Sequence, residues 1–76
     1  MIPEYTKESI DSFVARKLPP GGFVSAVLEN NLSQAFARAD LENERHMKDI
    51  VSYVYNHIPM DAWGSPEKVA AWWKGE

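Results

Sequence analysis

The chain has 76 residues, of which 45% are hydrophobic and 25% are charged, a composition typical of one small globular domain rather than a disordered segment. It contains no cysteine, so disulfides and thiolate chemistry are excluded. The net charge is −3, with eight Lys and Arg scattered among eleven Asp and Glu, and this balance disfavours binding to the phosphates of nucleic acid.

The ends and the hydropathy of the chain predict a cytoplasmic protein. No apolar run approaches the ~20 residues that a membrane span needs. The N-terminal stretch MIPEYTKESID is acidic and polar, whereas a signal peptide is basic and then apolar.

The first predicted helix begins at Thr6, whose side chain suits an N-cap, with Glu8 in its first turn. The run LPPGG stops this helix, because proline cannot continue it and glycine permits a tight turn. The apolar residues between these signals have helical spacing and are Ile10, Phe13, Val14 and Leu18.

Two short helices are predicted next, separated by the run ENN. The first extends from Gly22 to about Glu29, and it ends there because Asn tolerates the left-handed conformation of a helix C-cap. Asn31 is the expected N-cap of the second. The residues expected to face inward are Phe23, Val24, Val27 and Leu28 in the first helix and Leu32, Ala35, Phe36 and Ala39 in the second.

The polar segment ADLENERH contains a helix boundary, and two further helices follow it. One ends at Pro59, and the other runs from Pro66 to about Lys74 with Ser65 as its N-cap. No stretch alternates with period two, and no hairpin turn is present, so we expect an all-α compact bundle of four to five short helices in a single domain, residues 1–76. The apolar stripe expected in the longer helix is Met47, Ile50, Val51, Val54 and Ile58.

All three tryptophans lie near the last helix. A buried Trp removes on the order of 200 Å² from water, so we expect Trp63 and one of the helical pair to anchor the core. Adjacent helical residues point about 100° apart, so the other member of the pair lies at a rim, where it is a candidate for a partner contact. Trp72 is the residue we assign to this role.

Four acids fall within ten residues: Asp40, Glu42, Glu44 and Asp49. They do not form an EF-hand, because Arg45 and Val51 stand where the loop needs Gly and Glu. The spacing of Glu42, His46 and Asp49 permits a weak surface metal site, but the ligands are too few and we expect no metal. The acids are either a solvated helix face or a patch that meets a basic surface of a partner.

The sequence predicts no enzyme and no cofactor. Gly21 and Gly22 precede a helix but lack the Lys-[Ser/Thr] of a phosphate loop, and no nucleophile motif or Ser-His-Asp spacing is present. A bundle of this size also has little room for a substrate pocket of a few hundred Å³.

A rival interpretation is DNA binding, because FVSAVLENNLSQAFARA resembles a helix-turn-helix. The side chains of Gln34 and Arg38 can read base edges in a major groove. Against this interpretation, Glu29, Asp40 and Glu42 flank the surface, and Lys or Arg that would contact phosphates are lacking. The presumed recognition helix would present Ser33, Gln34, Ala37 and Arg38.

The chain resembles a family of small proteins from phages, prophages and other mobile elements. The shared motifs are I-P-x-Y-T, P-P-G-G-F, A-V-L-x-N-x-L, R-A-D-x-x-N, I-V-x-Y-x-Y-N and W-G-S-P-E-K-V, which here occupy residues 2–6, 19–23, 26–32, 38–43, 50–56 and 63–69. One departure falls at Met47 and Lys48, where the family pattern has a proline, and it implies that the two middle helices join more smoothly in this chain.

The family has no assigned active site, so the resemblance carries over no catalytic residue. It implies a non-enzymatic protein of the host bacterial cytoplasm that binds a host protein, with inhibition of a defence complex such as a CRISPR–Cas effector as the leading hypothesis. The residues expected to meet that partner are Asp40, Glu42, Glu44, Asp49 and Trp72. The alternatives are a small helix-turn-helix regulator that binds DNA and an accessory phage protein that forms homo-oligomers.

Overall fold

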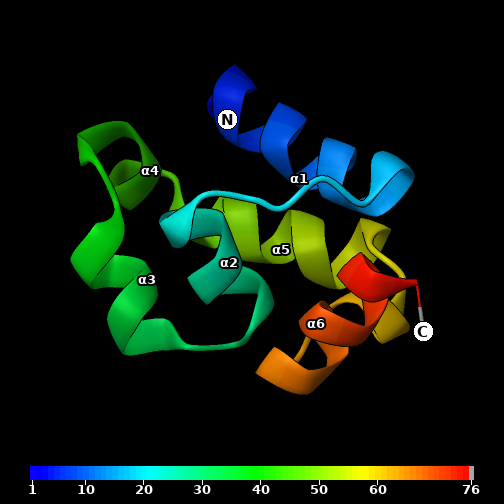
Figure 1. Cartoon of the computed structure of the whole chain (residues 1–76). Coiled ribbons are helices and arrows are strands. Elements are labelled where there is room, and N and C mark those ends of the chain that lie inside the picture. The colour runs from blue at the N-terminus through cyan, green and yellow to red at the C-terminus, as the bar shows by residue number, and fades with distance from the viewer. Residues whose placement is uncertain (76) are drawn as a thin grey trace.

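The computed structural model describes residues 1–75, which form six α-helices and one 3-10 turn. Helix α1 lies along one side of the molecule with α2 and α5 beneath it, α3 and α4 lie at one end, and α6 lies at the other (Figure 1). The all-α prediction is confirmed. The elements are α1 (Glu4–Arg16), α2 (Gly22–Leu28), α3 (Leu32–Arg38), α4 (Leu41–Arg45), α5 (Met47–His57), η1 (Met60–Ala62) and α6 (Pro66–Lys74).

The core lies where α1, α2 and α5 meet. Ile10 and Phe13 of α1, Leu28 of α2, and Ile50 and Val54 of α5 are almost completely buried. Each such side chain contributes about 1.5–3 kcal/mol by leaving water. The periodicity of the sequence therefore identified the face of α5 that forms the core.

The start of α1 differs from the prediction. Pro3, not Thr6, is the N-cap residue, and its carbonyl accepts a hydrogen bond from the Lys7 amide at 3.0 Å. The helix ends at Arg16, and its C-cap residue Lys17 adopts the left-handed conformation with φ of 55°, so Leu18 lies outside the helix and is exposed. The predicted N-cap was wrong because Thr6 forms a tertiary contact that local sequence does not reveal.

The turn between α2 and α3 has the conformation that the sequence predicts. Asn30 has φ of 63°, and the amides of Asn30 and Asn31 bond back to the carbonyls of Val27 and Ala26. This pair of hydrogen bonds is the Schellman motif that ends many helices. The Asn31 side chain then accepts from the Gln34 amide at 3.2 Å, so the predicted N-cap of α3 is confirmed.

Helix α6 also begins and ends as expected. The Ser65 hydroxyl accepts from the Lys68 amide at 3.2 Å, Pro66 is the first helical residue, and Lys74 is the last. Just before this cap, Gly64 has φ of 115°, a conformation that other residues rarely adopt. Its amide donates to the Leu28 carbonyl at 2.7 Å, which ties the loop before α6 to the end of α2.

The polar segment before α5 forms a helix of its own, α4, which the sequence did not resolve. Its N-cap is Asp40, whose carboxylate accepts from the Asn43 amide at 2.8 Å. His46 alone separates α4 from α5 along the chain, and its backbone torsion angles are not helical. Among residues 1–75, no helix has both the length and the apolar character needed to cross a membrane.

Two hydrogen bonds join α1 to the α4 region. The Thr6 hydroxyl donates to the Asn43 side-chain carbonyl, and both residues are buried. One residue earlier, the Tyr5 hydroxyl donates to the Asp40 carboxylate at the surface. One buried and one exposed hydrogen bond thus fix α1 against the α4 region, which lies more than 30 positions away in the sequence.

We predict that Thr6→Val lowers the free energy of unfolding by about 1–3 kcal/mol, because the shape is kept while the Asn43 carbonyl loses its buried donor. Urea denaturation measures this change. Ser33→Ala, which removes an exposed hydroxyl from α3, serves as the control and should stay within about 0.5 kcal/mol of the parent. An equally small effect of Thr6→Val would show that the buried hydrogen bond is not needed.

Candidate functional site

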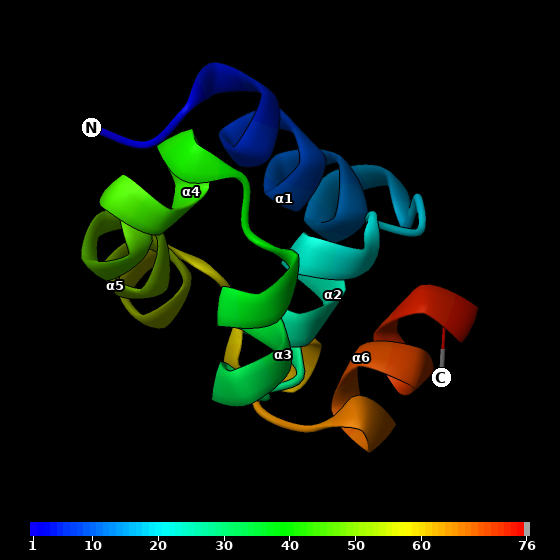
Figure 2. The same ribbon diagram turned by 90° about the vertical axis from the view of Figure 1, so that its left-hand side faces the viewer.

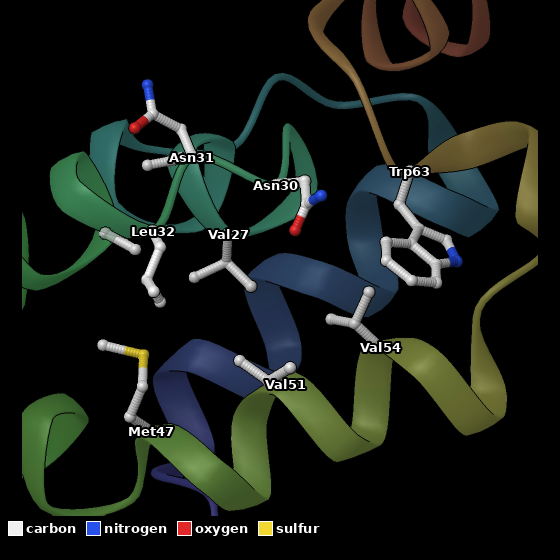
Figure 3. Close-up of a pocket in the computed structure, with 10 residues that line it drawn as sticks. Val27, Asn30, Asn31, Leu32, Met47, Val51, Val54 and Trp63 are labelled. Carbon is white, nitrogen blue, oxygen red and sulfur yellow. The ribbon is translucent and has the colours of Figure 1, made fainter.

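An apolar groove lies between the α2–α3 hairpin and α5, and we call it the α3–α5 groove. Figure 3 shows Val27 and Leu32 on one side facing Met47, Val51 and Val54 on the other. The groove has a volume of about 70 Å³, and none of the described residues that line it is charged. Its polar components are the amide side chains of Asn30 and Asn31, of which Asn30 projects into the groove (Figure 3).

The groove exists because α3 packs through a small residue. Ala35 is the buried residue of α3, while Leu32 is 64% exposed and Phe36 is 48% exposed. Leu32 and Phe36 were predicted to face inward, and the structure corrects this prediction. A seven-residue helix that approaches α2 through alanine leaves its larger apolar side chains outside the contact.

Across the groove, Val51 is the member of the α5 stripe that stays 43% exposed, although the sequence placed it in the core. It lies on the edge of the stripe that faces Leu32 rather than α1 (Figure 3). Sequence reasoning therefore missed Leu32 and Val51 as site residues. The available signal for Leu32 was the composition of α3, in which Ala35 and Ala37 flank Phe36 and Leu32 begins the helix, so that apolar residues occupy more than one face.

Trp63 forms one end of the α3–α5 groove (Figure 3). The Gly64–Leu28 hydrogen bond holds its backbone against α2, and the Tyr55 ring meets the indole edge-on with ring centroids 5.9 Å apart. Beyond Trp63, a second hollow of about 390 Å³ is lined by Tyr55, Met60, Trp63, Gly64 and Lys68. The apolar surface thus continues past the Trp63 indole into this hollow, where Lys68 is the charged residue among those that line it.

The two tryptophans of α6 have different surroundings. The Trp72 indole N–H donates to the Val14 carbonyl of α1 at 3.2 Å, and the Lys17 ammonium lies 4.2 Å from the centre of its ring. Trp73 is 47% exposed. Trp63 and Trp72 are therefore the anchors packed on the core, and Trp73 rather than Trp72 lies at the rim.

The four acids lie on α4, its N-cap and the start of α5, and most of their carboxylates have partners within the chain. Asp40 accepts from Tyr5 and caps α4, and Asp49 binds the N-terminal ammonium at 2.8 Å. Glu42 lies 3.7 Å from Arg45. Glu44 is the one of the four whose carboxylate has no hydrogen bond or ion pair to residues 1–75. The structure thus brings the four acids together, and two of them, Glu42 and Asp49, are paired with a positive group.

These contacts shift the pKa values of the paired groups. The hydrogen bond from Tyr5, followed by the bond from the Asn43 amide, lowers the pKa of Asp40, and the hydrogen bond from the N-terminus lowers that of Asp49. The same bond to Asp40 raises the pKa of Tyr5 to about 12. In the part of the chain that the structure describes, no three His, Cys, Asp or Glu side chains are arranged to hold a metal ion.

The helix-turn-helix candidate corresponds to α2, the Asn30–Asn31 turn and α3. Ser33, Gln34 and Ala37 are exposed on α3, but they share its surface with Leu32 and Phe36. The Arg38 guanidinium packs on the first turn of α2, where a Cβ added to Gly22 would lie 3.0 Å from it. The surface of α3 is therefore more apolar than DNA recognition would require.

No protein-family model matches the chain, and neither a curated protein nor a solved structure matches it.

We predict that Asp40→Asn lowers the pKa of Tyr5 from about 12 toward its ordinary value of 10.0, while Asn still caps α4. Because the folded pKa lies above the unfolded one, the contact stabilises the fold below pH 10 and is lost as the pH rises toward 12. An NMR titration of the tyrosine ring carbons reports the change, and a Tyr5 pKa that stays near 12 in the variant would contradict it.

We predict that Trp72→Phe lowers the free energy of unfolding by about 1 kcal/mol or more, because the Val14 carbonyl loses its donor. Trp73→Phe makes the same chemical change at the exposed neighbour and should cost no more than about 0.5 kcal/mol. Urea denaturation of both variants gives the comparison. Equal losses would mean that the indole hydrogen bond to α1 contributes nothing.

Proposed function

We propose that this chain is a non-enzymatic protein-binding domain whose α3–α5 groove receives an apolar segment of a partner protein. The supporting observation is that Leu32 and Val51, 64% and 43% exposed, face each other across an uncharged groove with Trp63 at its end. Contiguous apolar surface bordered by polar groups is typical of protein interaction sites.

The composition of the groove favours one kind of occupant. Its lining is aliphatic, apart from Trp63 and the amides of Asn30 and Asn31, so a charged or phosphorylated segment would lose hydration without gaining an ionic partner. The apolar face of an amphipathic helix meets these requirements, since helix-in-groove recognition inserts side chains at i, i+3 and i+4 into such a surface.

The resemblance to small proteins of phages and mobile elements points to a host protein as the partner. A bacterial defence complex, such as a CRISPR–Cas effector, is the candidate class, and occlusion of its working surface is the proposed mechanism. The acids Asp40, Glu42, Glu44 and Asp49 would then add attraction to a basic surface of that complex. Since three of the four are already paired within the chain, we assign the main contribution to the groove.

We predict that Val51→Glu weakens partner binding at least tenfold, because it places a charge in an apolar contact. The tagged protein and its variants are used to capture partners from nuclease-treated bacterial lysate, and retained proteins are quantified by mass spectrometry. Leu18→Glu is the matched control, since Leu18 is a 48% exposed leucine outside the groove. A protein retained by the parent and by Leu18→Glu, but not by Val51→Glu, is the expected result.

Two outcomes would contradict this assignment. If Val51→Glu retains the partner while Glu42→Lys with Glu44→Lys loses it, binding depends on the acidic surface instead of the groove. If the parent retains nothing from nuclease-treated lysate but retains DNA from untreated lysate, the α2–α3 unit is a DNA-binding element.

A further inference from the structure

A further concave site lies between α2, α6 and the loop that precedes α2, and we call it the α2–α6 pocket. Its volume is about 240 Å³. Figures 1 and 2 show α6 beside α2 at this end of the molecule. The base of the pocket includes Phe13 and Val69, both buried, and its sides include Pro19, Pro20 and Trp73.

Glu29 is the one charged residue among the described residues that line the α2–α6 pocket. Its carboxylate has no hydrogen bond or ion pair to residues 1–75. A half-exposed indole and an unpaired carboxylate therefore share a hollow whose remaining surface is mainly proline and aliphatic. This combination suits a cation carried on an aliphatic stem, since the stem contacts the apolar sides while the indole face and the carboxylate attract the charge.

The position of Glu29 is unfavourable for the helix itself. It is the C-cap residue of α2, where the helix dipole favours positive charge. Within residues 1–75, each of the other five α-helices has a basic residue in its last turn, whereas α2 has none and is followed by this acid. An acid placed against the local electrostatics, without a partner in the fold, points to an interaction outside the fold.

We propose that the α2–α6 pocket binds an arginine side chain of a partner protein. Arginine fits better than lysine, because its planar guanidinium stacks on an indole and pairs with a carboxylate through two parallel hydrogen bonds. This proposal rests on the proposed protein-binding function and gives the same partner a second point of contact. Its test uses a small probe and needs no partner, so failure of the pocket and failure of the groove are distinguished.

The experiment is an NMR titration of the isotope-labelled protein with N-acetyl-L-arginine methylamide, and the citrulline analogue is the uncharged control of the same shape. The arginine probe should produce saturable shifts of the Trp73 indole N–H and the Glu29 amide, with affinity at least tenfold greater than that of the citrulline analogue. Equal binding of the two probes, or shifts confined to the acids around α4, would overturn the proposal.

Variants separate recognition from a structural role. Glu29→Gln should weaken the arginine probe at least tenfold while leaving the urea midpoint unchanged or higher, because it removes an unfavourable charge from the end of α2. Glu67→Gln, which neutralises an exposed acid of α6 that does not line the pocket, should leave the affinity unchanged. An unaltered affinity in Glu29→Gln would refute the role of the carboxylate.

Discussion

The buried hydrogen bond between Thr6 and Asn43 is the constraint on which the arrangement of the helices depends. Helix α4 has five residues, too few to be stable through its own backbone bonds, so it needs a tertiary contact to persist. Thr6 supplies that contact from α1, and the neighbouring Tyr5–Asp40 bond holds the N-cap of α4. Once α4 is held, α5 follows after one residue, and its apolar face meets α1 and α2 in the core.

Several of the short motifs in the sequence meet where helices contact one another. The I-P-x-Y-T and R-A-D-x-x-N motifs meet through Tyr5–Asp40 and Thr6–Asn43. The central tyrosine of I-V-x-Y-x-Y-N, Tyr53, donates to Asp11 of α1. Burial raises the pKa of the Asp11 carboxyl, but the hydrogen bond from Tyr53 and then that from Lys7 bring it below its ordinary value. These polar residues thus form contacts between helices within the fold.

The α3–α5 groove and the α2–α6 pocket both border α2. This helix has seven residues, and Ala26 and Val27 line the groove while Ser25 and Glu29 line the pocket. The hollows differ in chemistry, because Asn30 and aliphatic side chains line one, while Glu29 and Trp73 line the other. A small bundle can therefore present two concave surfaces of different chemistry.

The sequence by itself determined the all-α class and the signals that act over one helical turn, including the Asn31 and Ser65 caps, the left-handed Asn30 and the core face of α5. These features depend on residues three or four apart, which periodicity and capping rules describe. Only the tertiary structure decided that Thr6 pairs with Asn43, that Leu32 and Val51 border a groove, and that Trp73 rather than Trp72 is at the rim. Each of these depends on which helix lies opposite, and periodicity identifies an apolar side chain without identifying the surface that covers it.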